Sequence, residues 1–334
     1  MANLNQTTMA DSIKVAYERR LLTRALPRMV HSRWAMKPRI SKYGSWEVRK
    51  FGSLSTVTSA LTEGTTPVEQ TAPSVTTTTI TPVFYGAFII YTDEMDLTVY
   101  DPVLSETSSI LGEQCGLSND TLVRNELVTD STIDYSADVS AVGSLDSPQH
   151  DISFTDIVKQ IGYLEAENAL PVDGEDFIII LHPHSYATLM MDETFVNMFI
   201  QESPDNAIRN GYVGRILRCK VFVSSNAYEW ADVGAGSTTD VYAALFIARE
   251  SYAILGLDGA SMPSEVDSGS ETAKPLTGQQ IKPVEIITKP LGSAGTNDPL
   301  NQRGSMAWKM CLTPEILNSS WIRCLKHTNA FSDD

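Results

Sequence analysis

The sequence lacks any long, uninterrupted hydrophobic run. No stretch of about 18 apolar residues occurs in the chain, so the sequence predicts no membrane span. The first 30 residues also lack the apolar core of a secretory signal, because arginines separate their short apolar groups. We therefore expect synthesis in the cytoplasm and exclude functions that require a membrane-embedded chain.

Cysteine is scarce, and its spacing does not suit a metal site. None of the four residues forms a C-x-x-C pair, the usual signature of structural zinc. The acidic segment 129–151 lacks the D-x-D-x-D-G spacing of a calcium loop. We expect free, mostly buried thiols, no metal and no cofactor. The cysteines are Cys115, Cys219, Cys311 and Cys324.

Catalytic motifs are absent as well. The sequence has no G-x-S-x-G, no H-E-x-x-H, no P-loop and no G-x-G-x-x-G after a strand. It has five histidines, and two of them, His182 and His184, follow a predicted strand. Because loops after strands often carry function, a hydrolase that uses this pair stays open as an alternative. The main expectation is a protein that is not an enzyme.

Charge is distributed unevenly along the chain. Residues 1–50 contain 11 Lys and Arg against three acidic residues, a net charge of +8 within a total of −16. The remainder therefore has a net charge of −24. A basic arm on an acidic body is able to reach a second copy of that body. The acidic body argues against a dedicated DNA-binding domain.

The basic arm contains a short amphipathic pattern. Such a short helix cannot bury its apolar stripe alone, so we expect it to dock elsewhere. The stripe consists of Ile13, Tyr17, Leu21 and Leu22, with Arg19, Arg20 and Arg24 beside it.

Residues 41–98 predict a long two-stranded excursion. Trp46–Phe51 alternates apolar and charged residues, and 82–92 is rich in aromatic and β-branched residues. We expect these two strands to pair. Between them, 53–81 is mostly Ser, Thr, Pro and Gly, with Glu63 and Glu69 as its charges. Such a long linker is either disordered or ordered by a neighbour. Trp46 and the two glutamates are candidates for that contact.

A long helix is predicted from 101 to 128. Asp101 suits a helix cap and Pro102 the first helical position. Gly112 and Gly116 lie one turn apart, and each glycine costs roughly 1 kcal/mol inside a helix. Close approach of another backbone offers an explanation, so both are candidate contacts between copies.

The segment 174–225 predicts the core of the fold. Phe177–Leu181 indicates a strand buried on both faces, residues 184–200 a helix, and Lys220–Val223 a second inner strand. Further strands are expected at 241–248, 251–257 and 284–288. A last pair of strands is expected at 304–312 and 321–326.

Three of these features expose surface that a monomer does not satisfy easily: the basic arm, the Ser/Thr-rich excursion and the very long helix. Self-assembly would satisfy all of them together. The candidate residues for contacts between copies are Ile13, Tyr17, Arg19, Arg20, Arg24, Trp46, Glu63, Glu69, Gly112 and Gly116.

The order of elements resembles the major capsid proteins of tailed phages (Caudoviricetes) with the Hong Kong 97-type fold. Within that family, 299–304 (PLNQRG) and the following WKMCLTPEILNSSWI are most similar to schitovirus-type podophage capsid proteins. The resemblance implies an α+β fold with an N-terminal arm at 1–40, an extended loop (E-loop) with a β-hairpin at 41–98, a peripheral domain at 99–171 with a spine helix at 101–128, an axial domain at 172–283, and a return to the peripheral domain at 284–334.

The function implied by the resemblance is self-assembly into hexamers and pentamers of an icosahedral head around double-stranded DNA. Implied partners are further copies, a portal protein, a separate scaffolding protein and a decoration protein, with DNA held without sequence-specific contact and no membrane. The implied location is the capsid of the virion. An encapsulin-like nanocompartment shell protein is the alternative of the same fold.

Overall fold

The computed structural model describes residues 29–40, 44–52, 54–66, 69–98, 103–172, 174–193, 195, 215–216, 218–257, 285–293 and 298–332. The predicted amphipathic stripe with its arginines, the helix start at Asp101 and Pro102, and the end of the predicted helix at 196–200 lie outside these residues.

The described chain is a mixed α+β structure. Its helices are α2 (Asp93–Thr98), α3 (Val103–Asp130), α4 (Phe154–Ala166) and α5 (Pro183–Met191). Its strands are β1 (Arg39–Ile40), β2 (Trp46–Phe51), β3 (Val75–Ile80), β4 (Phe84–Thr92), β5 (Thr132–Tyr135), β6 (Phe177–Leu181), β7 (Arg215–Ile216), β8 (Cys219–Val223), β9 (Glu229–Trp230), β10 (Val241–Ile247), β11 (Tyr252–Leu257), β12 (Glu285–Lys289), β13 (Arg303–Cys311), β14 (Thr313–Ile316) and β15 (Ile322–His327).

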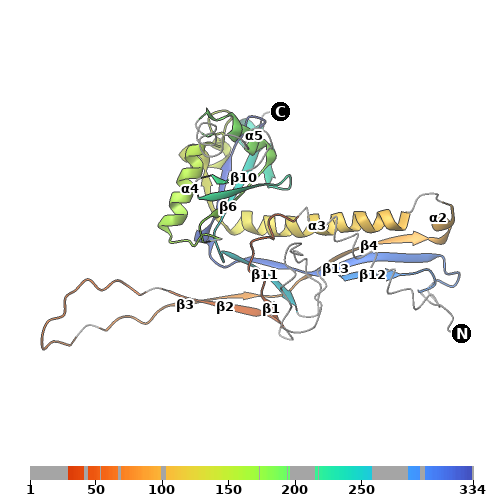
Figure 1. The fold of residues 1–334 in the computed structure, drawn as a ribbon, viewed down its shortest axis with the longest axis horizontal. Coiled ribbons are helices and arrows are strands. Elements are labelled where there is room, and N and C mark those ends of the chain that lie inside the picture. Colours follow the sequence, from red (N-terminus) through yellow and green to blue (C-terminus); the bar gives the residue numbers. More distant parts are fainter. Residues whose placement is uncertain are drawn as a thin grey trace.

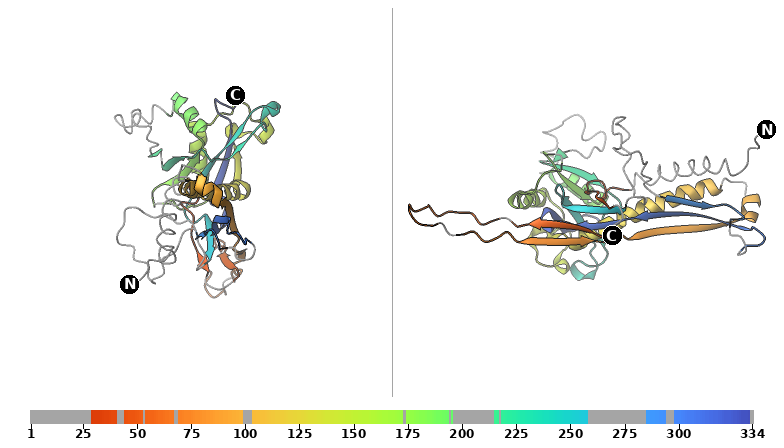
Figure 2. Two further views of the ribbon diagram at one scale, coloured as in Figure 1. Left: turned by 90° about the vertical axis from the view of Figure 1, so that its right-hand side faces the viewer. Right: turned by 90° about the horizontal axis from the view of Figure 1, so that it is seen from below.

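The molecule consists of a compact lobe that stands on a long, narrow base (Figure 1). The lobe contains the seven-stranded sheet, in the order β5-β15-β10-β6-β8-β7 with β9 beside β10, together with α4 and α5. The base contains α3 and the sheets β12-β13-β4 and β1-β11-β14, and the β2-β3 hairpin projects from one end (Figure 2).

Strand β6 runs through the centre of the lobe and is buried on both faces. Phe177 and Ile179 pack with side chains of α4 and α5, whereas Ile178 and Ile180 pack with side chains of α3. This confirms the prediction from its continuous apolar run. Pro183 begins α5 at the first helical position, and His182 is the N-cap, as the sequence predicts.

Helix α3 connects the base to the lobe. Its 28 residues correspond to a length of about 42 Å. It contacts β13 and β14 in the base and β10 and β15 in the lobe. The helix predicted from 101 to 128 is therefore confirmed over its described part, and it packs against strands of three different sheets.

The expected pairing of the excursion is wrong. Strand β2 pairs with β3, whereas β4, which was expected to be its partner, pairs along its whole length with β13. The cause lies in the segment VTTTTI, where β-branched residues favour a strand although the composition resembles a linker. Strand β4 joins the base instead, because Tyr85 and Ala87 pack against the main core beside α3.

Strand pairing also differs from two other expectations. Strands β13 and β15 do not pair with each other, because β13 lies between β12 and β4 while β15 lies between β10 and β5. In addition, β5 and β15 share the sheet of β10 in the lobe, although 99–171 and 284–334 were expected in the peripheral domain. Parallel pairing of β5 with β15 joins segments that are far apart in sequence.

All four cysteines are free and buried, as the sequence predicts. Burial raises the pKa of the Cys115, Cys219 and Cys324 thiols to about 12, so these side chains are not reactive thiolates. Within the described part of the chain, no helix is long and apolar enough to cross a membrane.

Candidate functional site

The base of the β2-β3 hairpin is fixed to the body of the molecule. Ile80 is buried, and Trp46 packs with it and with Leu255 of β11. The Lys50 ammonium donates a hydrogen bond to the side-chain carbonyl of Asn318 at 3.0 Å. These contacts set the direction in which the hairpin leaves the base.

The loop beyond the strands continues as an extended ribbon (Figure 1). Gly52 N donates to Ser74 O at 2.7 Å. At the tip, Thr65 N donates to Thr62 O at 3.2 Å, and Gly64 has a φ of +80°. A glycine at the third position of a hydrogen-bonded turn is typical of a type II turn. The tip therefore has a defined turn without packing against the body.

The hairpin and its loop expose an unusual amount of apolar surface. Monomeric proteins rarely leave a contiguous group of large apolar side chains in water. The charged residues near the tip are Glu63 and Glu69, and both are exposed. The exposed apolar side chains are Phe51, Leu54, Val57, Leu61 and Val75.

A second exposed apolar surface lies on the base sheet, on the face of β4 that points away from α3. We call it the outer β4 face and define it by Phe84, Phe88 and Ile90. Phe88 is 68% exposed and Ile90 is 54% exposed. The ammonium group of Lys309 lies 4.8 Å from the centre of the Phe84 ring, so the apolar face has a basic neighbour.

The two surfaces are both apolar, have neighbouring charges of opposite sign, and lie towards opposite ends of the elongated molecule (Figure 1). The hairpin loop is apolar with acidic residues, and the outer β4 face is apolar with a basic residue. A surface at one end that fits a surface at the other end generates head-to-tail contacts between copies, and these close into rings when the rotation permits.

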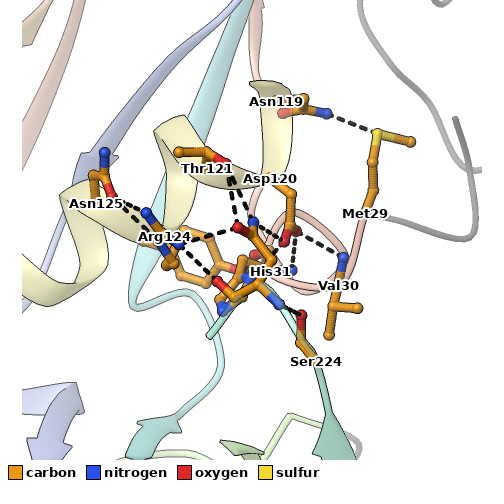
Figure 3. Close-up of polar contacts among 11 residues, drawn as sticks. Met29, Val30, His31, Asn119, Asp120, Thr121, Arg124, Asn125 and Ser224 are labelled. Atoms are coloured by element: carbon orange, nitrogen blue, oxygen red, sulfur yellow. Dashed lines mark hydrogen bonds and ion pairs between the residues drawn. The ribbon is translucent and has the colours of Figure 1, made fainter. Parts of the chain in front are cut away.

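A buried polar cluster fixes the first described residues to the middle of α3 (Figure 3). One carboxylate oxygen of Asp120 accepts hydrogen bonds from the backbone N–H groups of Val30 and His31, each at 2.7 Å. The other oxygen contacts His31 Nδ1 at 2.8 Å and accepts from the Asn226 amide at 2.9 Å. The Asp120 and His31 side chains are fully buried.

The same cluster connects α3 to the lobe. Arg124 donates to the Asn226 backbone and side-chain oxygens at 2.9 and 3.0 Å, and its guanidinium lies over the Tyr228 ring. Burial alone would raise the pKa of Asp120, but the hydrogen bonds of His31 and Asn226 and the attraction of His31 lower it. The carboxylate thus stays ionised and joins three separate segments of the chain.

His182 and His184, the pair considered above as possible hydrolase residues, have a structural role. His182 Nδ1 accepts a hydrogen bond from His184 N at the N-terminus of α5, at 3.3 Å. Both rings contact Tyr242, and the His184 ring also lies 4.9 Å from the Phe331 ring. No group of three metal-binding side chains occurs among the residues that the structure describes. This geometry packs the two imidazoles against an aromatic cluster.

Two histidines of the lobe are held in the neutral form. Burial lowers the pKa of His327 from 6.5 to about 4. Burial and the neighbouring His184 lower the pKa of His182 to about 4 as well. A group whose pKa is lower in the folded chain than in the unfolded chain takes up its proton preferentially on unfolding.

We expect the stability of the lobe to fall in acid for this reason. The contribution of neutral His327 is fully present above pH 6.5 and is lost as the pH falls towards 4. It amounts to about 3 kcal/mol at most. Urea unfolding at about pH 7 and about pH 4.5 should show a smaller loss in His327→Gln than in the unsubstituted chain. Equal losses in both proteins would contradict the assignment.

The residues predicted for contacts between copies fall into three groups. Trp46 lies at the base of the hairpin, and Glu63 and Glu69 lie on its exposed loop. Gly112 and Gly116 are buried in α3 within the chain itself. The others lie outside the described residues: Ile13, Tyr17, Arg19, Arg20 and Arg24. The role of all of them between copies stays a prediction.

Sequence reasoning missed the outer β4 face and the Asp120 cluster. The segment FYGAFIIYT has apolar residues at alternate and at adjacent positions, a pattern that indicates a strand with two apolar faces. An analysis of both faces of this strand would have indicated that one of them needs a partner outside the subunit. Asp120 gives no comparable signal, because His31 and Asn226 are both far from it in sequence.

Comparison with known proteins finds similar structures but no similar sequences. No protein-family model and no curated protein sequence matches the chain. Among solved structures, a chain of the capsid of cyanophage P-SCSP1u is similar with a TM-score of 0.63 and 14% identity, over 90% of this chain and 89% of that chain. A chain of the cyanophage Pam1 capsid is similar with a TM-score of 0.62 and 11% identity, over 92% of both chains.

A virus-like particle from Pyrococcus furiosus is also similar, though less closely. Its TM-score is 0.50 at 13% identity, over 94% of this chain and 99% of that chain. These similarities extend over nearly the whole length of each protein. The chain therefore has the fold of phage capsid chains.

Proposed function

We propose that this chain is the major capsid protein of a tailed phage. Copies of it assemble into the icosahedral head that encloses double-stranded DNA, and the chain is a structural protein rather than an enzyme. One observation carries the proposal: two complementary apolar surfaces are exposed towards opposite ends of a subunit whose fold matches phage capsid chains over about 90% of its length. A soluble monomer would leave both surfaces in water.

The contact between copies is proposed to join these two surfaces. The hairpin loop of one copy covers the outer β4 face of the next, so that Glu63 or Glu69 approaches Lys309. Burial of apolar side chains supplies the free energy, whereas the charges favour one orientation. Each contact is small, but many identical contacts around a closed shell stabilise one another.

The finer classification is proposed as well. The long α3, the projecting hairpin and the two-part body support a Hong Kong 97-type fold, in which α3 is the spine helix and the hairpin is the E-loop. The motif at 299–304 supports a schitovirus-type capsid protein. The strand pairing suggests one revision of the domains: β5, α4 and β15 belong with β10 in the axial lobe.

The proposed partners follow from this role. They are further copies in hexamers and pentamers, a portal protein, a separate scaffolding protein and a decoration protein. The net charge of −24 on the body beyond residue 50 disfavours binding to DNA phosphates, so we propose that the shell encloses the DNA without sequence-specific contact. The proposed location is the capsid of the virion.

A nanocompartment shell is the second candidate, and the similarity to the virus-like particle from Pyrococcus furiosus favours it. The two functions differ in what the shell contains. Particles purified from infected cells should contain double-stranded DNA if the protein is a phage capsid protein. A shell filled with a single enzyme would support the nanocompartment instead.

Limited proteolysis tests assembly directly. We expect protease to cut the loop 54–74 in free subunits and to leave it intact in assembled shells, since a neighbour covers it there. Size-exclusion chromatography and negative-stain electron microscopy separate and identify the two states. A chain that stays monomeric at every concentration, with this loop resistant to protease, would contradict the proposal.

A further inference from the structure

The side of α3 that faces solvent has an apolar pair with nothing described on top of it. Ile110 is 56% exposed and Leu117 is 43% exposed. They are seven residues apart, so they lie on the same side of the helix, two turns from each other. Glu106 is exposed on the same side and makes this stripe acidic as well as apolar.

The chain enters the described fold beside the middle of α3, on the buried side of the helix. Asn119 donates a hydrogen bond from its amide to the Met29 sulfur at 2.8 Å, and Asp120 binds the next two backbone N–H groups. Residues 1–28 therefore leave from the middle of α3. Asn119 is about half a turn around the axis from the stripe, and Leu117 is only about 3 Å from it along the axis.

The sequence of residues 1–28 matches the stripe in two respects. It carries apolar residues at helical spacing, of which Leu22 is seven residues before Met29. The five steps from Arg24 to Met29 reach about 17 Å when extended. This length allows the chain to pass around a helix about 10–12 Å across to the side of Leu117. The arginines beside the apolar residues have the opposite charge to Glu106. A short tether also keeps the segment at a high effective concentration near its own α3.

We propose that residues 13–24 dock as a helix on α3 of the same subunit, over Ile110 and Leu117. The inference goes beyond the proposed capsid function, because it concerns the isolated subunit and holds whether or not shells form. The docked segment covers the apolar pair and places Arg19, Arg20 or Arg24 near the acidic side of α3.

Cysteine cross-linking tests this arrangement, since the native thiols are buried. We pair Leu21→Cys with Leu117→Cys in the full chain and oxidise it under dilute conditions. The matched control pairs Leu21→Cys with Val158→Cys, because Val158 on α4 is also 43% exposed. We expect an intrachain disulfide to form at least about tenfold faster at position 117 than at position 158. Tyr17→Cys with Ile110→Cys provides a second, independent pair.

Non-reducing gels distinguish the outcomes. A fast-migrating monomer band supports docking within one subunit. A disulfide-linked dimer as the main product shows that a second copy occupies the stripe, and it overturns the proposal. Equal rates at positions 117 and 158 show that nothing docks there, and they overturn it as well. Neither result depends on shell assembly, so failure here is distinct from failure of the proposed function.

Discussion

A Phe88→Glu substitution should abolish shell formation and leave the subunit folded. Phe88 is the most exposed side chain of the outer β4 face, at 68%. Its replacement places a carboxylate where the hairpin loop of a neighbour brings Glu63, Glu69 and apolar side chains. Burying an unpaired charge costs several kcal/mol, which exceeds what one small contact supplies. The same cost recurs at every contact of a shell.

Size-exclusion chromatography and electron microscopy would measure this effect. The stability of the isolated subunit should change by less than about 0.5 kcal/mol, because the side chain is largely in water before assembly. The matched control is Phe88→Leu, which keeps the surface apolar and should still form shells. Normal shells from Phe88→Glu would show that the outer β4 face lies outside the contacts between copies.

The second large effect concerns stability. Asp120→Ala should destabilise the subunit by about 3–5 kcal/mol, because it leaves several buried donors without an acceptor. Those donors are the N–H groups of Val30 and His31 and the amide of Asn226. Urea unfolding would show the loss as a lower midpoint with an unchanged slope.

The control for Asp120→Ala is Glu165→Ala, in helix α4, where alanine fits the backbone well. Glu165 also forms an ion pair, with Arg218 at 2.6 Å, but its side chain is 45% exposed. An exposed pair contributes little to stability, so no measurable shift of the midpoint is expected. A similar loss in both variants would mean that the buried cluster does not hold the N-terminal segment, α3 and the lobe together.

Elements with a strong local pattern were predictable from the sequence. The run FIIIL predicts a buried strand because no loop or half-exposed strand tolerates so many β-branched apolar residues. The sequence indicates a helix that begins at Ser153 or Thr155, and in the structure Ser153 is the N-cap of α4 and accepts a hydrogen bond from Asp156 N in a capping box. In each case the signal lies within a few residues, so tertiary contacts did not need to be known.

Features that depend on distant partners were not predictable. The threonine run of β3 looks like a linker until β2 is seen beside it. The sequence of β4 fits a hairpin as well as a sheet, and β13, more than 200 residues later, decides between them. The polar cluster around Asp120 likewise depends on distant residues. It joins residues of three segments, and none of these segments has a sequence pattern that indicates the cluster.

Helix α3 restricts how a shell of such subunits is able to change shape. Because α3 packs against strands of three sheets, a rotation of the lobe relative to the base would disrupt packed side chains at several points. Among the described residues, the hairpin is attached to the body only near its base, through Trp46, Ile80 and Lys50. In the proposed shell, we therefore expect bending of this projecting ribbon to accommodate the difference in curvature between pentamers and hexamers, while the body of each subunit keeps its conformation.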